Sequence, residues 1–375
     1  MDLALYDSEI GYYARAARRS GRAGDFFTSV DVGPMFGELL AIQIAEMAAT
    51  LSRAEQAPPL HAGADLGRPF DLVEAGAGDG RLAADILRSL RRDCESVYDR
   101  VQLHLVESSP EARAAQRATL GENGDRLASS GADLPPSFEG ILLANELLDA
   151  MPVHQVVMRN QELREVFVDA GVARPDGEFV LVEGPPSTPA LAEYLARVNV
   201  VLESGWRAEI NLRAVDWIRD AARRLRRGFM ILIDYGHDAR ELYSSTHAGG
   251  TLTTLAAHTM SGTEATGGAP AWLQRPGQHD ISAHVDFTSV RTAAEAEGMA
   301  MLGFLDQTYF LLGLAKLENP ENLETLSNAA NLGKRLALKT LLMPGGLGST
   351  HKVLILGKAV GAPALVGCSY RVRVT

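Results

Sequence analysis

The sequence contains few cysteines and no long apolar run. Its 375 residues include two cysteines, Cys94 and Cys368. Two isolated cysteines form neither a disulfide framework nor a structural zinc cluster, and they indicate a reducing compartment. No window is both apolar enough and long enough to cross a bilayer, which takes about 20 residues. We therefore expect no membrane insertion.

The N-terminal residues lack the features of a targeting segment. Residues 1–13 carry Asp2, Asp7 and Glu9 and have no continuous apolar run. A signal peptide needs an apolar stretch, and a transit peptide is poor in acidic residues. Because neither pattern is found, we expect the protein in the cytoplasm.

Positive charge is in deficit across the whole chain. Lys and Arg total 36 against 47 Asp and Glu, which gives a net charge of -11. Binding of nucleic acid needs clustered positive charge, so we expect no nucleic-acid partner. The hydrophobic fraction of 46% excludes a wholly disordered chain. The length allows one large domain with insertions or two domains.

Short apolar runs alternate with amphipathic helical patterns, which predicts an α/β fold with a mainly parallel sheet. The runs that read as strands are residues 70–75, 101–107, 140–144, 229–234 and 353–356. The segments whose periodicity predicts helices are residues 81–90, 110–120 and 212–227. Residues 153–182 resemble β-hairpin strands instead. Residues 235–282 are rich in Gly, Thr, His and Pro without strong periodicity, which predicts a long functional loop.

A glycine-rich turn joins the first predicted strand to the first predicted helix. It contains Glu74, Gly76 and Gly78, and its spacing differs from the dinucleotide pattern G-x-G-x-x-G. The acid before the first glycine suits a ligand with a cationic amino group, such as S-adenosylmethionine. Glu107 ends the next strand, where an acid can accept hydrogen bonds from ribose hydroxyls. The alternative is a turn that serves packing only.

Polar residues also follow the third predicted strand and fill an N-terminal loop. Asn145, Glu146 and Asp149 come after the strand, where the ligand crevice of an open α/β sheet lies. The alternative is that Asn145 or Asp149 merely caps a helix. The loop at residues 24–29 is dense in aromatic residues and fits a cover over a flat ligand, or else a surface arm packed on the core.

Histidines gather in the aperiodic segment and its flank. His258, His279 and His284 suggest a metal, but their spacing is not helical and no cysteine accompanies them. We therefore expect no metal site.

The order of motifs resembles one family, the MidA-type S-adenosylmethionine-dependent methyltransferases. That family includes a mitochondrial complex I assembly methyltransferase that modifies an arginine. The matching stretches reach to about residue 317, with one more near the end: GYY (11–13), GDFFTS (24–29), FGELLA (36–41), EAGAGDGRLAADILR (74–88), HLVESSPEARAAQ (104–116), ANELLDAMPV (144–153), LIDYG (232–236), GGTL (249–252), QHDISAHVDF (278–287) and HKVLILGK (351–358). Departures from the family pattern fall at Val30-Asp31, near His247, at residues 253–255 and at 348–352, and they concern the substrate more than the cofactor.

The resemblance implies a class I methyltransferase fold, with a Rossmann-like seven-stranded sheet, an inserted subdomain and a long lid. The implied organisation has an N-terminal arm and helix over the cofactor site at residues 1–60. The methyltransferase core would comprise residues 61–158 and 205–375, with the lid at 235–282. The inserted hairpin and helix subdomain would occupy residues 159–204.

The resemblance also implies the function and the site. S-adenosylmethionine would be the cofactor, and its ligands would be Glu74, Gly76, Gly78, Glu107, Asn145, Gly24 and Thr28. An arginine of a protein substrate, linked to respiratory complex I, would be the methyl acceptor. Its guanidinium needs carboxylate partners, and the candidate catalytic residues are Glu146, Asp149 and Asp25, with Asp234 behind them. The oligomeric state stays open.

Three other functions remain open at this point. A small-molecule methyltransferase would keep the cofactor motifs but close its crevice to a peptide. A non-catalytic assembly factor would use the same fold as a binding surface. A dinucleotide dehydrogenase is the weakest alternative, because its glycine pattern is absent.

Overall fold

The computed structural model divides the chain into two compact units. It describes residues 1–14, 28–53, 67–170, 179–256, 259–261, 270–315, 332–342 and 351–370. We call the first the core unit: Phe27–Glu146, Asp220–Asp234 and Ala294–Thr375. We call the second the accessory unit: Met1–Phe26, Leu147–Arg219 and Tyr235–Ala293. Each is described by itself.

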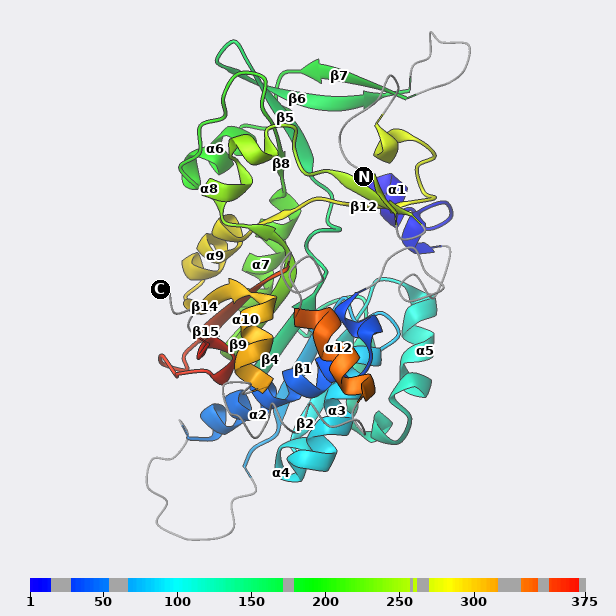
Figure 1. Cartoon of the computed structure of the whole chain (residues 1–375), viewed down its shortest axis with the longest axis vertical. Coiled ribbons are helices and arrows are strands. Elements are labelled where there is room, and N and C mark those ends of the chain that lie inside the picture. Colours follow the sequence, from blue (N-terminus) through cyan, green and yellow to red (C-terminus); the bar gives the residue numbers. More distant parts are fainter. Residues whose placement is uncertain are drawn as a thin grey trace. The chain divides into compact units, whose positions relative to one another are not determined.

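The core unit is built on a mainly parallel sheet (Figure 1). Among the described residues, seven strands lie in the order β14-β15-β9-β4-β1-β2-β3, and β13 pairs with β9 beside this path. The strands are β1 (Phe70–Ala75), β2 (Val101–Val106), β3 (Leu127–Gly131), β4 (Phe138–Asn145), β9 (Leu225–His237), β14 (Ala300–Asp306) and β15 (His351–Lys358). The pairs β1–β2, β1–β4, β2–β3 and β4–β9 are parallel, and β14–β15 is antiparallel. The predicted mainly parallel class I methyltransferase sheet is confirmed, and β13 adds an eighth strand to the seven that were predicted.

Helices cover this sheet through one apolar core. The helices of the unit are α2 (Met35–Arg53), α3 (Arg81–Asp93), α4 (Glu95–Tyr98), α5 (Pro110–Leu120), α10 (Gln307–Ala315) and α12 (Leu332–Leu342), with the shorter turns η2 (Ser29–Val32), η3 (Gly121–Arg126) and η7 (Val366–Cys368). Leu82, Ile86, Leu87 and Leu90 lie on one face of α3 and are buried in that core, as their helical spacing predicts. The sequence therefore sets which face of α3 meets the sheet.

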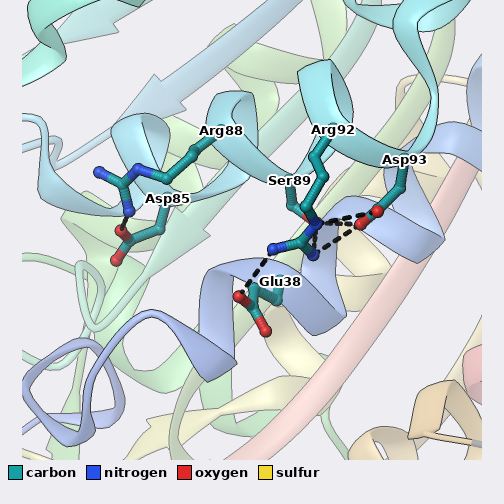
Figure 2. Close-up of polar contacts among 6 residues, drawn as sticks. All are labelled: Glu38, Asp85, Arg88, Ser89, Arg92 and Asp93. Carbon is teal, nitrogen blue, oxygen red and sulfur yellow. Dashed lines mark hydrogen bonds and ion pairs between the residues drawn. The ribbon is translucent and has the colours of Figure 1, made fainter.

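A close approach fixes α2 against α3. A β-carbon on Gly37 of α2 would lie 2.6 Å from the β-carbon of Asp85 on α3. Figure 2 shows the polar contacts beside this approach, where Arg92 of α3 reaches Glu38 of α2 at 3.2 Å. Arg92 also forms two hydrogen bonds to Asp93, of 2.9 and 2.6 Å. These ion pairs are exposed, so packing at Gly37 contributes more to the contact than charge does.

Helix α2 corrects one expectation from the sequence. By length and composition, Met35–Ser52 passes the test for a membrane-spanning helix, whereas the sequence analysis expects no such window. Of this window, 61% is buried within the protein. A core helix passes the same test, and many α2 residues belong to the apolar core.

The accessory unit contains a four-stranded antiparallel sheet with the order β7-β6-β5-β8. Its strands are β5 (His154–Arg159), β6 (Glu162–Asp169), β7 (Val180–Gly184) and β8 (Arg207–Ile210). The hairpin strands predicted within residues 153–182 are present. The boundaries 159–204 for an inserted subdomain stay a prediction, and the sheet also includes β8 and most of β5, which lie outside them.

Two predictions about elements are wrong. Helix α7 (Leu212–Arg224) ends before residue 227, because Leu225 already pairs with Phe138 and Arg227 with Glu139 in the sheet. The segment at residues 235–282 is not a continuous loop. Its described residues form α8 (Ala239–Leu242), η4 (Ser245–His247), η5 (Ala271–Leu273) and the sheet β11-β10-β12, made of Thr259–Ser261, Thr253–Ala256 and Asp280–Ser282. Strands of three or four residues are too short to give a periodic signal.

Helix α1 (Asp2–Tyr6), η1 (Tyr12–Ala14) and α6 (Ala190–Arg197) belong to the accessory unit. Strand β13 (Val285–Asp286) pairs in parallel with Gly236 and His237 at the end of β9. Helix α9 (Phe287–Ala296) follows β13 directly.

Candidate cofactor site

The glycine turn after β1 is built from left-handed backbone positions. Gly76, Gly78 and Gly80 have φ angles of 72°, 52° and 86°. Glycine adopts such angles without the strain that a β-carbon brings, which explains the alternating glycines. The amides of Gly76 and Ala77 donate to the carbonyl of Val106 at 2.9 and 3.1 Å. These bonds attach the turn to the end of β2. Gly80 is the N-cap residue of helix α3.

Gly78 leaves room above the turn. No heavy atom of the described residues lies within 4 Å of the place where its β-carbon would stand. Its amide donates to Glu107 Oε2 at 2.9 Å, and its carbonyl accepts from Gln116 Nε2 at 2.8 Å. A ligand can therefore approach the backbone here.

Glu107 links the turn to the start of α5. Its Oε1 accepts a hydrogen bond from the amide of Ser109 at 2.8 Å, while Oε2 accepts from Gly78. An ionised carboxylate offers about four acceptor positions. Ser108 Oγ also donates to Oε1, at 3.3 Å, so one acceptor position of Glu107 is left for a ribose hydroxyl.

Glu74 is a buried acid at the start of the turn. Glu74 is only 5% exposed to solvent. Burial raises the pKa of Glu74 to about 8, while a backbone hydrogen bond from Ala83 acts in the opposite direction. Its Oε2 has no hydrogen-bond partner among the described residues. The Ala83 contact fits the capping of α3, and the second oxygen fits a cationic group that arrives with a ligand.

Asn145 and Glu146 stand at the end of β4. Asn145 Nδ2 donates to Glu146 Oε1 at 3.2 Å, and Asn145 Oδ1 is buried without a partner in the described part of the chain. Glu146 has a φ of 51°, and its amide donates to the carbonyl of Ile233 at 2.8 Å. A left-handed conformation at a residue other than glycine costs on the order of 1–3 kcal/mol and is often found at functional sites.

The structure brings six predicted site residues to one edge of the sheet. Ala75 pairs with Val106 and with Ala144, so β1, β2 and β4 end at the same level. The residues that follow these strand ends, or stand just before the turn, are Glu74, Gly76, Gly78, Glu107, Asn145 and Glu146. A Gly-rich turn at the carboxyl edge of a parallel sheet is the place where such folds bind nucleotide-like ligands.

Of the other four predicted residues, Thr28 and Asp149 are within the described part of the chain. Thr28 donates through both its amide and its hydroxyl to Asp31 at 2.9 Å, and Asp31 lies 2.9 Å from Arg81 at the start of α3. Thr28 therefore caps η2 near the glycine turn. Asp149 is buried in the accessory unit, whereas Glu146 belongs to the core unit, so their partnership stays a prediction. Gly24 and Asp25 lie outside the described residues.

Two residues of this site were not predicted from the sequence. Gln116 is fully buried on α5, and besides holding Gly78 it accepts from Ser130 at 2.7 Å. His351 on β15 is also fully buried, and its Nε2 lies 3.5 Å from Glu146 Oε1. The sequence offers a sign of the role of Gln116, because this polar residue lies on the otherwise apolar face of a helix. His351 had none, because its partner is distant in the sequence.

The residues present fit S-adenosylmethionine. The unpartnered oxygen of Glu74 suits its ammonium group, and Glu107 suits its ribose. Gly78 leaves its backbone open to close approach. The strand order and this turn define the class I methyltransferases.

The chain belongs to a family of S-adenosyl-L-methionine-dependent methyltransferases, whose sequence model matches residues 39–305. It is similar to "Protein arginine methyltransferase NDUFAF7 homolog, mitochondrial" of Drosophila melanogaster, with 29% identity over 92% of this chain and 80% of the fly protein. The NDUFAF7 protein of Rattus norvegicus is also 29% identical, over 92% of this chain and 72% of its own.

A solved structure supports the same assignment. A protein from Burkholderia thailandensis, bound to S-adenosyl-homocysteine, aligns with a TM-score of 0.80 at 28% identity and covers 98% of this chain and 88% of its own. The family resemblance and the cofactor, S-adenosylmethionine, are confirmed. The expected cytoplasmic location is wrong, because the fly and rat relatives carry "mitochondrial" in their names.

Proposed function

We propose that the protein transfers a methyl group from S-adenosylmethionine to an arginine side chain of a protein substrate. Two similar proteins are named protein arginine methyltransferases. The net charge of -11 favours a basic substrate segment over an acidic one. The candidate site also carries several carboxylates, among them Glu74, Glu107 and Glu146.

The proposed reaction is an in-line displacement. Bound S-adenosylmethionine supplies a methyl carbon activated by its sulfonium. The bond from carbon to sulfur breaks, and sulfur keeps the electron pair. A guanidinium nitrogen forms the new bond with its lone pair, and one proton passes from that nitrogen to solvent water. The protein aligns the two reactants and stabilises the charge that changes during transfer.

Glu146 is the observation that carries the proposal. Its backbone is held in a left-handed conformation, and its carboxylate contacts Asn145 and lies near His351. A carboxylate fixed in this way can orient a planar guanidinium through paired hydrogen bonds. We propose Glu146 as the orienting acid, with Asp149 and Asp25 as further carboxylates on the acceptor side.

We also propose a set of cofactor contacts. Glu74 would meet the ammonium, and Glu107 would meet the ribose. The backbone at Gly76 and Gly78 would approach the cofactor closely, and Asn145 would use its unpartnered Oδ1. Thr28 and Gly24, from the predicted N-terminal loop at residues 24–29, would complete the set.

The decisive experiment replaces Glu146 with Gln. This change keeps the shape and removes the charge, so methyl transfer should fall by about 100-fold or more while affinity for the cofactor stays within about threefold. Radiolabelled methyl transfer into basic peptides and extract proteins measures the first quantity, and calorimetry with S-adenosylmethionine measures the second.

Glu139→Gln is the matched control. Glu139 lies on the same strand, β4, at its other end, in an exposed pair with Arg226 at 3.0 Å. Its substitution should leave both quantities unchanged. An active wild-type protein whose Glu146→Gln variant is equally active refutes the role of Glu146. Label found only in small metabolites favours the small-molecule methyltransferase instead, and label found nowhere favours the assembly factor.

The substrate itself is the finest part of the proposal. The family that the sequence motifs resemble includes a complex I assembly methyltransferase. We therefore propose a subunit of respiratory complex I as the acceptor protein. Mass spectrometry of complex I from source cells with and without the protein tests this. Unchanged arginine methylation in every subunit rules it out and leaves the chemistry of methyl transfer intact.

A further inference from the structure

Three histidines converge within the accessory unit. His237 is the last residue of β9, His247 ends η4, and His284 immediately precedes β13. One ring nitrogen from each lies within 4.8 Å of the chosen nitrogens of the other two. The ring centroids are separated by 4.9 to 5.9 Å. The sequence predicts no metal site on the basis of His258, His279 and His284, of which only His284 belongs to this group and His258 lies outside the described residues.

Backbone contacts explain why the three side chains meet. Val285 and Asp286 pair in parallel with Gly236 and His237, so β13 places His284 beside the end of β9. A β-carbon on Gly236 would lie 2.2 Å from the carbonyl oxygen of Val285, so this pairing needs glycine. The short α8 and η4 then return the chain to His247.

A neighbouring oxygen sets the tautomer of one of the rings. His247 Nδ1 lies 3.0 Å from the carbonyl oxygen of Glu241, and a carbonyl only accepts hydrogen bonds. In the neutral His247 ring, Nδ1 therefore carries the hydrogen and Nε2 holds a lone pair. His237 Nδ1 lies 3.1 Å from the carboxylate of the same residue, Glu241. A carboxylate or carbonyl on the far nitrogen is the usual support of a metal-bound histidine.

His284 supplies the third nitrogen. Its Nδ1 is buried and has no hydrogen-bond partner among the described residues. An arrangement without a ligand would leave that buried nitrogen unsatisfied.

We propose that His237, His247 and His284 form a binding site for a divalent first-row transition metal, with zinc as the favoured occupant. Imidazole nitrogens suit zinc, whereas magnesium and calcium prefer oxygen ligands. In a tetrahedral site with Zn–N bonds of about 2.0 Å, nitrogens lie about 3.3 Å apart, so modest rotations of the rings close the site. The fourth position takes water. The ion would join β9, η4 and the segment before β13.

The test uses the full chain, freed of its affinity tag and treated with chelator. Zinc titration against a chromophoric chelator should give one bound ion per chain. Cobalt(II) in its place should give the intense visible absorption of a four-coordinate ion. His247→Ala and His284→Ala should each weaken zinc binding by at least about tenfold.

His279→Ala is the control, because His279 is half-buried in the same unit but outside the trio. Its affinity for zinc should equal that of the wild type. Circular dichroism checks that each variant is folded, and the wild-type cobalt spectrum tests the site without any substitution. A wild type that binds no zinc, a six-coordinate cobalt spectrum, or equal zinc binding by wild type and both trio variants overturns the proposal.

Discussion

At the scale of single residues, the two carboxylates at the glycine turn, Glu74 and Glu107, differ in burial and in hydrogen bonding. Glu107 is half-buried and accepts hydrogen bonds from two backbone amides. Glu74 is buried, and burial raises its pKa to about 8. The first is prepared for hydroxyl groups, and the second is prepared for a cation.

Replacing Glu107 with Ala should weaken S-adenosylmethionine binding by about 1–3 kcal/mol, the scale of a lost hydrogen bond to a charged group. The loss also leaves the amides of Gly78 and Ser109 without their acceptor. Calorimetric titration of the folded variant measures the change. Glu111→Ala, an exposed acid in the first turn of α5, is the control and should bind like the wild type. Unchanged affinity in Glu107→Ala contradicts the ribose assignment.

Glu74 makes stability depend on pH. Its folded pKa of about 8 lies above the ordinary value of 4.5, so the folded protein holds an extra proton between these values. Its stabilising contribution is therefore full below about pH 4.5 and is lost as the pH rises toward 8, by up to about 5 kcal/mol.

Denaturant unfolding of wild type and Glu74→Gln across this range measures the effect. The difference in unfolding free energy between the two should shift steadily in favour of Glu74→Gln as the pH rises. Saturating S-adenosylmethionine should reduce the shift, because its ammonium stabilises the carboxylate. Parallel pH profiles of the two proteins would show that Glu74 titrates normally.

At the scale of elements, two glycines let the central strands approach. Gly140 on β4 faces Asp71 on β1, and Gly228 on β9 faces Gly140. Their φ angles are 156° and 142°. A β-carbon on Gly140 would lie 1.9 Å from the carbonyl oxygen of Asp71. The central sheet therefore depends on glycine at positions that no short motif marks.

Gly140→Ala should destabilise the protein by more than about 3 kcal/mol, because backbone must move to make room. Thermal or denaturant unfolding measures this. Gly131→Ala on the edge strand β3 is the control, since no described atom lies within 4 Å of its added β-carbon, and it should change stability by less than about 1 kcal/mol. Similar stability of both variants would mean that β1 and β4 can separate at little cost.

At the scale of the whole molecule, the net charge of -11 should act on substrate encounter. Raising the ionic strength screens the attraction for a basic peptide, so kcat/KM should fall several-fold as salt rises from about 50 to 300 mM. Methyl-transfer assays over that range measure it. Affinity for S-adenosylmethionine, measured over the same range, is the control and should change less. A salt-independent kcat/KM argues against electrostatic steering of the substrate.

The sequence by itself determined the fold class and the cofactor. Residues 70–93 form a strand, a glycine turn and a helix that are contiguous in the chain, so their spacing and periodicity are legible without tertiary contacts. The acid at Glu107 and the pair Asn145-Glu146 are legible for the same reason, because each follows a strand directly.

Only the tertiary structure decided which distant side chains meet. The closeness of His351 to Glu146, the bond from Gln116 to Gly78 and the gathering of His237, His247 and His284 depend on strand register and helix packing. The same holds for the short strands of residues 253–282, which exist because they pair with one another. Local patterns carry no record of such contacts, since they form between segments that the fold alone brings together.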